Sequence, residues 1–176
     1  MDVTWEEDVL ALFEDLEMQA DGLYLVDRGQ EVSALAEAGY AEVSLASRLQ
    51  TSRGCKVQVR TADGPDVAGT LVRSGADWLL IDGGSSSWLV HLPAVVLISG
   101  LAGGSVAESH WPLTARLSVG SVLRRIAGGG RGCVMWLVGG RQVSGVLGRV
   151  GADFVTLGED DPVVPFRSLV AVRSDS

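Results

Sequence analysis

Several residue types that many functional classes require are scarce in this chain of 176 residues. It holds two cysteines, Cys55 and Cys133, without a C-x-x-C pair or a histidine at ligand spacing, so no metal site and no disulfide framework is expected. Its two histidines, His91 and His110, fit no Ser-His-Asp or Cys-His pattern, which predicts a protein that is not an enzyme and has no cofactor. No apolar run approaches the ~20 residues that span a bilayer. The acidic N-terminus lacks the basic start and apolar stretch of a signal peptide, so the sequence predicts a cytoplasmic protein with no membrane partner.

Lysine is almost absent, and the charges that are present are unevenly distributed. Lys56 is the single lysine among 14 basic residues, a usage typical of high-GC bacterial (actinobacterial) proteins. The formal net charge is −8, of which residues 1–43 contribute −11 and residues 44–176 contribute +3. An acidic arm therefore precedes a mildly basic body, and the negative total does not exclude an anionic partner for the body.

The arm carries a helical pattern of apolar residues. They recur at steps of three and four, which predicts one apolar stripe on a helix whose opposite face is acidic. The stripe consists of Trp5, Val9, Leu12, Leu16, Leu23 and Val26. Gly22 and Gly29 would each cost about 1 kcal/mol relative to alanine inside a helix, so one interrupted helix and two helices both remain open. The arm either packs on the body or protrudes and recruits a protein partner.

The body contains an internal repeat. Residues 69–78 read GTLVRSGADW and residues 145–154 read GVLGRVGADF, and seven of the eleven positions in 67–77 are identical to those in 143–153. Each copy reads as a short helix followed by five short strands, which indicates a tandem duplication. Because about 60 residues bury little surface, we expect each copy to curl into a small barrel. The expected domains are the acidic helical arm at 1–43, barrel 1 at 44–100, a linker at 101–117 and barrel 2 at 118–176.

Small residues recur at the same places in both copies and predict turns and bends. Asp63-Gly64 is a two-residue hairpin signal. A glycine inside each second strand would supply the bend of a barrel, and an Asp after each Gly-Ala pair would bond the amides of its own turn. The expected structural residues are Gly64, Gly69, Gly75, Asp77, Gly140, Gly145, Gly151 and Asp153.

The stretch SVLRRIAGGGRGCVMWLVGGRQVSGVLGRVGADFVTL, residues 121–157, resembles bacterial Sm-like (Hfq-like) proteins in its layout. A short helix, a strand, the turn Gly139-Gly140 and a strand reaching Gly145 follow in the family's order and at similar lengths. The resemblance covers both repeats and implies two tandem five-stranded, SH3-like barrels, each preceded by its helix. In this family the fourth strand of one barrel pairs with the fifth strand of the next, which closes rings without free strand edges. The resemblance therefore implies RNA as a partner. It also implies self-association, in which three chains with two barrels each form a six-barrel ring.

The positions that bind RNA in this family differ here. Its pocket Asp and Asn correspond to Gly75/Gly151 and Leu79/Val155, and its Lys-His pair to Leu92-Pro93 and Phe166-Arg167. The expected nucleic-acid contacts are instead a basic rim with one aromatic ring, namely Arg124, Arg125, Arg131, Phe166 and Arg167. The sequence thus predicts a non-catalytic RNA-binding regulator whose acidic arm is autoinhibitory. The alternative is a protein-assembly scaffold or transcription-associated interaction module that does not bind nucleic acid.

Overall fold

The computed structural model describes residues 39–159 and 162–175. The chain divides into two compact units, residues 1–43 and 44–176. In the first unit residues 39–41 are helical, and the predicted apolar stripe from Trp5 to Val26 lies outside the described residues. The second unit is mainly β and contains both repeats.

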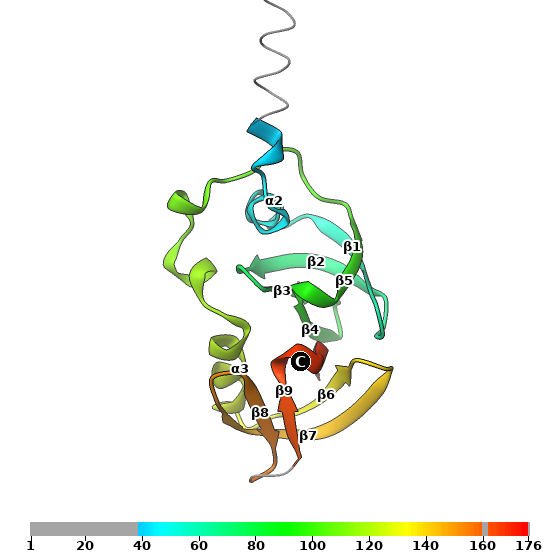
Figure 1. Cartoon of the computed structure of the whole chain (residues 1–176). Coiled ribbons are helices and arrows are strands. Elements are labelled where there is room, and N and C mark those ends of the chain that lie inside the picture. Colours follow the sequence, from blue (N-terminus) through cyan, green and yellow to red (C-terminus); the bar gives the residue numbers. More distant parts are fainter. Residues whose placement is uncertain (1–38, 160–161, 176) are drawn as a thin grey trace, which may run out of the picture. The chain divides into compact units, whose positions relative to one another are not determined.

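Each repeat has the expected order of a short helix followed by five strands, with one 3-10 turn before the last strand (Figure 1). The first repeat consists of α2 (Leu45–Thr51), β1 (Lys56–Thr61), β2 (Val67–Ser74), β3 (Trp78–Asp82), β4 (Ser86–His91), η1 (Leu92–Ala94) and β5 (Val95–Ser99). The second consists of α3 (Val119–Ala127), β6 (Gly132–Leu137), β7 (Arg141–Val150), β8 (Phe154–Leu157), β9 (Val163–Pro165), η4 (Phe166–Ser168) and β10 (Leu169–Asp175). The connection between them contains η2 (Glu108–His110) and η3 (Leu113–Arg116).

The two repeats share one strand register. In β3 and β4, Trp78 lies opposite His91 and Leu79 opposite Val90, and the equivalent pairs in β8 and β9 are Phe154 with Pro165 and Val155 with Val164. The register of β1 against β5 shifts next to Thr61, and that of β10 against β6 shifts at the matching place after Leu169. The two repeats thus have the same cross-strand residue pairs and the same position of the register shift. The duplication seen in the sequence is therefore also present in the structure.

The prediction of two separate barrels is not confirmed. All ten strands form one antiparallel sheet in the order β5-β1-β2-β3-β4-β10-β6-β7-β8-β9, and this sheet is not closed. The halves meet where β4, the fourth strand of the first repeat, pairs with β10, the fifth strand of the second. The physical reason is that each repeat leaves strand edges unpaired, and the nearest complementary edge belongs to the other repeat of the same chain.

The two hydrophobic cores also cross this junction. The core of the first repeat includes Val170 and Ala171 from β10 together with Trp136 from β6. The core of the second repeat includes Trp78 and Leu89 from β3 and β4. Each repeat therefore contributes side chains to the core of the other. This adds to the buried surface that about 60 residues could form alone, although the sheet is not closed.

An aromatic cluster lies on the same junction. The rings of Trp88 in β4 and Trp136 in β6 have centroids 5.0 Å apart, on either side of β10. The guanidinium carbon of Arg173, in β10, is 5.9 Å and 5.7 Å from the two centroids. Such a cation–π arrangement adds to the strand pairing across the junction.

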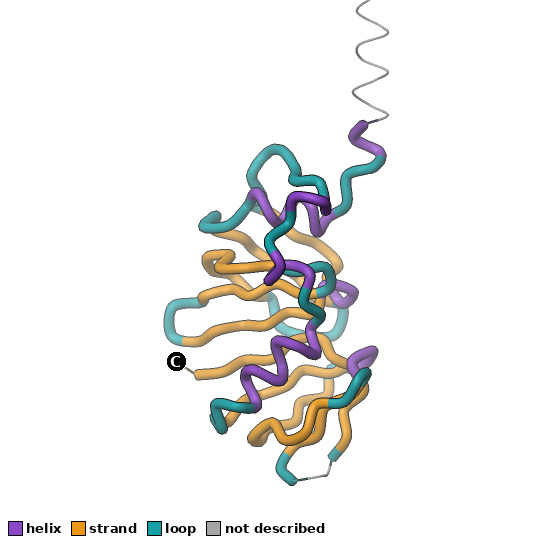
Figure 2. Tube along the Cα trace, turned by 90° about the vertical axis from the view of Figure 1, so that its left-hand side faces the viewer, coloured by secondary structure: helices purple, strands orange, loops and turns teal. Residues whose placement is uncertain are grey.

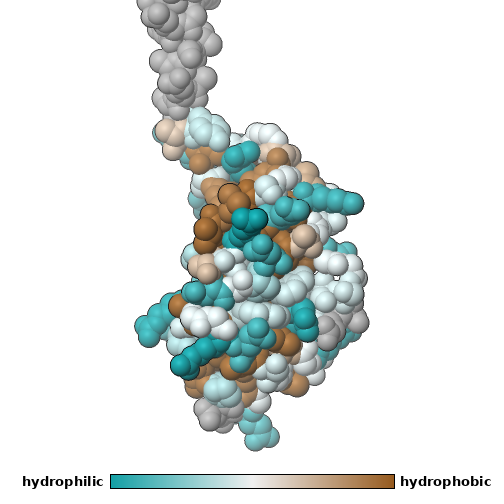
Figure 3. Space-filling view, turned by 90° about the vertical axis from the view of Figure 1, so that its right-hand side faces the viewer, coloured by the Kyte–Doolittle hydropathy of each residue, from teal (hydrophilic) through white to brown (hydrophobic). Residues whose placement is uncertain are grey.

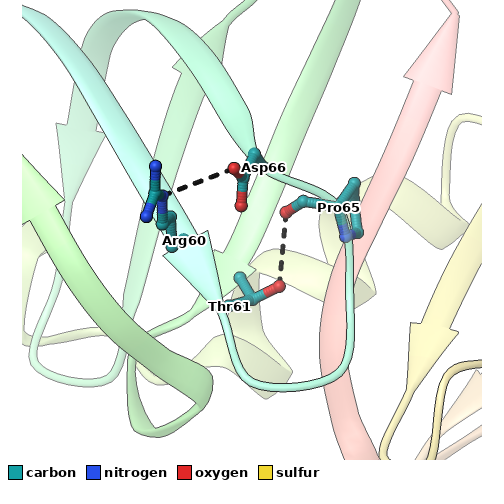
Figure 4. A network of polar contacts seen from close by, with 4 residues as sticks. All are labelled: Arg60, Thr61, Pro65 and Asp66. Carbon is teal, nitrogen blue, oxygen red and sulfur yellow. Dashed lines mark hydrogen bonds and ion pairs between the residues drawn. The ribbon is translucent and has the colours of Figure 1, made fainter.

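The loop after β1 differs from the predicted two-residue hairpin. Residues 62–66 separate β1 from β2, and within this loop Thr61 Oγ1 donates a hydrogen bond to Pro65 O at 3.2 Å (Figure 4). The same figure shows the ion pair of Arg60 Nε with Asp66 Oδ2 at 3.5 Å. Gly64 is required by space rather than by its φ angle, because a Cβ there would lie 2.8 Å from both Thr61 Oγ1 and Val170 Cγ1.

The corresponding turn of the second repeat is tighter and depends on the φ angles of its glycines. Gly139 and Gly140 have φ of +79° and +70° between β6 and β7, a region in which other residues are strained. Gly145, the glycine predicted to bend the second strand of this repeat, is not its crowded glycine. A Cβ on Gly145 would meet only ordinary contacts with Leu157, whereas one on Gly148 would overlap the carbonyl of Gly158. In the first repeat Gly69 is the crowded position, against the carbonyl of Asp82.

The connection between the repeats packs on the body. Figure 2 shows η3 and α3 following one another along one side of the stacked strands. Trp111 is buried with Ala46 of α2 and Ala115 of η3, and its Nε1 donates to Val106 O at 2.9 Å. The segment expected as a linker at 101–117 is therefore held against the body through Trp111.

Candidate nucleic-acid interface

A groove runs between α2 and α3 on the side where the connection crosses the sheet. Three adjoining hollows of about 250, 380 and 270 Å³ form it, and neighbouring hollows share lining residues. Arg73 and Trp78 belong to the first and second hollows, and Leu80 and Arg125 to the second and third. We call these three adjoining hollows together the arginine groove.

Four arginines give the arginine groove its charge. Arg53 follows α2, Arg73 lies in β2, Arg125 lies in the last turn of α3 and Arg131 precedes β6. All four are exposed, and the lining of the three hollows includes no Asp or Glu. None of these guanidinium groups forms an ion pair or a hydrogen bond with another described residue. They are therefore available to an anionic ligand.

The walls of the groove are fixed by hydrogen bonds between distant segments. Trp78 Nε1 donates to Leu117 O at 2.7 Å, and the Val119 N–H at the start of α3 donates to Asp77 Oδ1 at 2.9 Å. Gln50 Nε2 of α2 donates to Ser74 Oγ at 3.0 Å and to Ser74 O at 3.2 Å at the end of β2. α2 is thus tied to the end of β2, which carries Arg73, and α3, which carries Arg125, is tied to the start of β3.

The repeated Gly-Ala-Asp-aromatic motif builds one of these attachments. The Gly75 N–H donates to Trp78 O at 2.8 Å, and the Gly151 N–H donates to Phe154 O at 2.9 Å. A Cβ on either glycine would overlap the following aromatic ring, so the ring lies directly over the turn. Asp77 differs from its predicted role, because its carboxylate accepts from α3, 42 residues away, rather than from its own turn. Its counterpart Asp153 is exposed.

The predicted basic rim is divided by the structure. Arg125 and Arg131 line the same hollow. Arg124 points to the end of β7, where its Nη2 donates to Gly151 O at 2.9 Å and its Nε to Val150 O at 3.4 Å. Phe166 packs beside Gly120 of α3 at the edge of the second core, and neither Phe166 nor Arg167 lines the arginine groove.

Sequence reasoning missed Arg53 and Arg73. Both belong to the first repeat, whereas all residues of the expected basic rim belong to the second repeat. Arg73 precedes Gly75-Ala76-Asp77 as Arg149 precedes the matching motif, but Arg149 does not line the groove, so this match gives no signal for the site. Their placement beside Arg125 depends on how β2 and α3 lie in the folded unit, which no local pattern encodes.

Three observations concern metal ions, the cysteine thiol and the membrane. The described residues contain no cluster of three or more His, Cys, Asp or Glu able to hold a metal ion. Burial raises the pKa of the Cys133 thiol, which disfavours the reactive thiolate. Within the described part of the chain, no helix combines the length and the apolar character needed to cross a membrane.

Comparison with known proteins does not assign the chain to a family. Neither the models of known protein families nor the curated protein sequences give a match.

Proposed function

We propose that the chain is a non-catalytic, cytoplasmic RNA-binding regulator that holds the RNA backbone in the arginine groove. The observation that carries this proposal is the set of four exposed arginines facing a groove whose lining has no acidic side chain. Arginines that neutralise phosphates release condensed counterions, which is the main source of sequence-independent affinity for nucleic acids. Contacts of this kind position the strand without reading its bases.

The groove favours backbone contact over base stacking. Trp78 is the one aromatic residue in the lining of the three hollows, and it is 4% exposed. Its indole N–H is already bonded to Leu117 O. Proteins that grip single strands by stacking need an accessible ring face. Binding in this groove therefore discriminates little between RNA sequences.

We further propose that each repeat is a variant of the Sm-like barrel. The pairing of β4 with β10 supports this, because it joins the fourth strand of one repeat to the fifth strand of the other, as the resemblance implies for neighbouring barrels. The RNA site proposed here is not the one that the resemblance implies, since Phe166 and Arg167 lie outside the groove.

The acidic arm supplies the regulatory part of the proposal. Residues 1–43 carry a charge of −11, and residues 44–176 carry +3. A tethered polyanion is present at a high effective concentration and competes with RNA for the same arginines. Regulation consists of relieving this competition, for example through a partner that binds the arm.

Two triple variants with the same net charge test the site. Arg73→Ala/Arg125→Ala/Arg131→Ala removes three groove arginines, and Arg60→Ala/Arg141→Ala/Arg167→Ala removes three exposed arginines outside the groove. Fluorescence anisotropy of the full chain with a labelled single-stranded RNA at low salt should show a large loss of affinity in the groove variant only. Equal losses would mean that general charge attraction, not the groove, binds RNA. A poly-glutamate peptide that competes as well as unlabelled RNA would favour an acidic protein partner instead.

The alternative function is a protein-assembly scaffold or transcription-associated interaction module. It is favoured by the unpaired edges of β5 and β9 at the two ends of the sheet. Absence of RNA binding at low salt, both in the full chain and in a variant with a neutralised arm, would leave this alternative in place.

A further inference from the structure

The third hollow of the arginine groove lies where the two repeats meet. It has a volume of about 270 Å³, and its lining comes from β3 and β4 of the first repeat and from α3, β10 and the loop after α3 of the second. It shares Leu80 and Arg125 with the second hollow and no residue with the first. The third hollow is therefore one end of the groove, and a strand that ends there places its terminal group in it.

The floor of the third hollow is apolar. Leu80 lies opposite Leu89 in the pair of β3 and β4, and Leu89 lies opposite Val172 in the pair of β4 and β10. Residues directly opposite each other in a sheet share a face, so these three side chains form a row. Ile126 of α3 lines the same hollow. Such a surface accommodates the ring of a base or a sugar.

Polar side chains converge on this hollow from three elements. Arg125 lies in the last turn of α3, Arg131 in the loop before β6, and Ser87 in β4. Both arginines are exposed and Ser87 is partly buried. None of the three side chains forms an ion pair or a hydrogen bond with another described residue. Two guanidinium groups and one hydroxyl are therefore available to the same ligand.

The glycine-rich loop after α3 leaves the recognition of an anion to these side chains. The N–H groups of the three glycines at 128–130 each donate to a carbonyl in the last turn of α3, at 3.0 to 3.1 Å. These bonds satisfy carbonyls that would otherwise need a partner at the helix end. The same N–H groups are consequently not available to a phosphate, and the arginines are not needed by the helix.

The side of the unit shown in Figure 3 has a different charge pattern. Figure 3 views the side on which Figure 1 places β1 and β5 and shows hydrophobic side chains gathered over the upper part of this face. A larger hollow, of about 460 Å³, lies against β1, β2 and β5, and Lys56 is the one charged side chain in its lining. A doubly charged group would meet one cation there and two in the third hollow. Charge, and not size, therefore selects the third hollow.

We propose that the third hollow binds a phosphomonoester, which RNA supplies as a terminal phosphate. This inference rests on the proposed function, because it assigns the end of the bound strand. A phosphodiester within a strand carries one negative charge, whereas a phosphomonoester carries about −1.5 to −2 at pH 7 and has three strong acceptor oxygens. Arg125 and Arg131 match this charge with two cations, and the Ser87 hydroxyl adds a third donor. The ring next to the phosphate packs on the apolar floor.

Three RNAs of one sequence test the inference with the full chain. They carry a 5′-hydroxyl, a 5′-phosphate or a 3′-phosphate, and each has its fluorescent label at the other end. In anisotropy titrations at low salt, a phosphorylated end should bind about tenfold more tightly than the hydroxyl end, because it gains charge-assisted hydrogen bonds. The phosphorylated RNA that gains affinity identifies which end of the strand lies in the hollow.

Two single variants with the same net charge separate the third hollow from the rest of the groove. Arg131→Ala removes a guanidinium that lines only the third hollow, and Arg53→Ala removes one that lines only the first. Both should bind RNA more weakly than the unmodified chain. The preference for the phosphorylated end should be lost in Arg131→Ala and kept in Arg53→Ala. Ser87→Ala, which leaves the net charge unchanged, should reduce this preference.

Equal affinity of the unmodified chain for phosphorylated and hydroxyl ends would overturn the inference and leave the proposed function standing. Equal loss of the preference in Arg53→Ala and Arg131→Ala would also overturn it, because the phosphate would then be attracted by the groove as a whole.

Titrations with adenosine 5′-monophosphate and with adenosine, followed by nuclear magnetic resonance, distinguish the two sources of the phosphate. Where RNA binds, the nucleotide should displace the phosphorylated RNA more effectively than adenosine does. If no RNA binds, the proposed function fails and the nucleotide alone decides the hollow. A preference for the nucleotide over adenosine that Arg131→Ala removes would then support the phosphomonoester site and replace the RNA end by a free mononucleotide. No such preference would overturn the site.

Discussion

The bond between Asp77 and the start of α3 offers a sharp test of how the two repeats are fixed to each other. Asp77 Oδ1 accepts a hydrogen bond from the Val119 N–H at 2.9 Å, although the two residues are 42 positions apart. A side chain that caps a helix N-terminus contributes about 1 kcal/mol, and the favourable placement of a carboxylate at the positive end of the helix adds about 0.3–1 kcal/mol. We therefore expect Asp77→Ala to lower the free energy of unfolding by about 1–2 kcal/mol.

Thermal unfolding followed by circular dichroism measures this effect. For a chain of this size, about 1–2 kcal/mol corresponds to a fall in Tm of roughly 2–8 °C. Asp77→Asn keeps an acceptor oxygen but loses the charge, so its Tm should fall less. Asp153→Ala is the matched control, because this Asp holds the same place in the repeated motif and is exposed. Equal Tm losses at Asp77 and Asp153 would contradict the argument, as would no loss at Asp77.

Three further predictions concern the turn glycine, the arm and the buried thiol. Gly75→Ala should destabilise the protein by about 1–3 kcal/mol in chemical denaturation, because its Cβ would overlap Trp78, whereas Gly132→Ala has open space and should lie within about 0.5 kcal/mol of the unmodified chain. The variant Glu6→Lys/Glu7→Lys/Asp8→Lys/Glu14→Lys reverses four arm charges and keeps the apolar stripe. It should bind RNA more tightly than the unmodified chain in an anisotropy titration at low salt. Unchanged affinity would refute autoinhibition. Because burial raises the pKa of Cys133, less of this thiol is ionised at a given pH. Its alkylation near pH 8, measured by mass spectrometry, should therefore be slow in the folded protein and faster after unfolding. Equal rates in folded and unfolded protein would contradict this.

Much of the secondary structure could be predicted from local patterns. Alternating apolar residues and turn glycines indicate ten strands, and the fixed spacing of Gly-Ala-Asp in both repeats predicts that they are built alike. The structure agrees to the level of individual cross-strand pairs, such as Leu79 with Val90 and Val155 with Val164. Local sequence determines these features because they depend on side-chain alternation and on turn chemistry within each repeat.

The features that depend on the arrangement of the two repeats could not be predicted in this way. The sequence predicts that the fourth strand of one barrel pairs with the fifth strand of another, but not that β4 and β10 of the same chain do so, because an edge strand carries no mark that distinguishes an internal partner from an external one. The role of Asp77 and the grouping of Arg73 with Arg125 follow from that arrangement. The repeats have also diverged in sequence, so equivalent glycines do not have equivalent surroundings. In β7 the glycine without space for a Cβ is Gly148 rather than Gly145.

The salt dependence of RNA binding tests the arginine groove most directly. For single strands, the plot of log K against log salt concentration has a negative slope, whose magnitude decreases by about 0.7 for each phosphate contact that is lost. Arg73→Ala/Arg125→Ala/Arg131→Ala should therefore flatten the slope by about two units relative to the unmodified chain. The control Arg60→Ala/Arg141→Ala/Arg167→Ala has the same net charge and should keep the original slope. Equal slopes in the two triple variants would contradict the assignment of the RNA backbone to the groove.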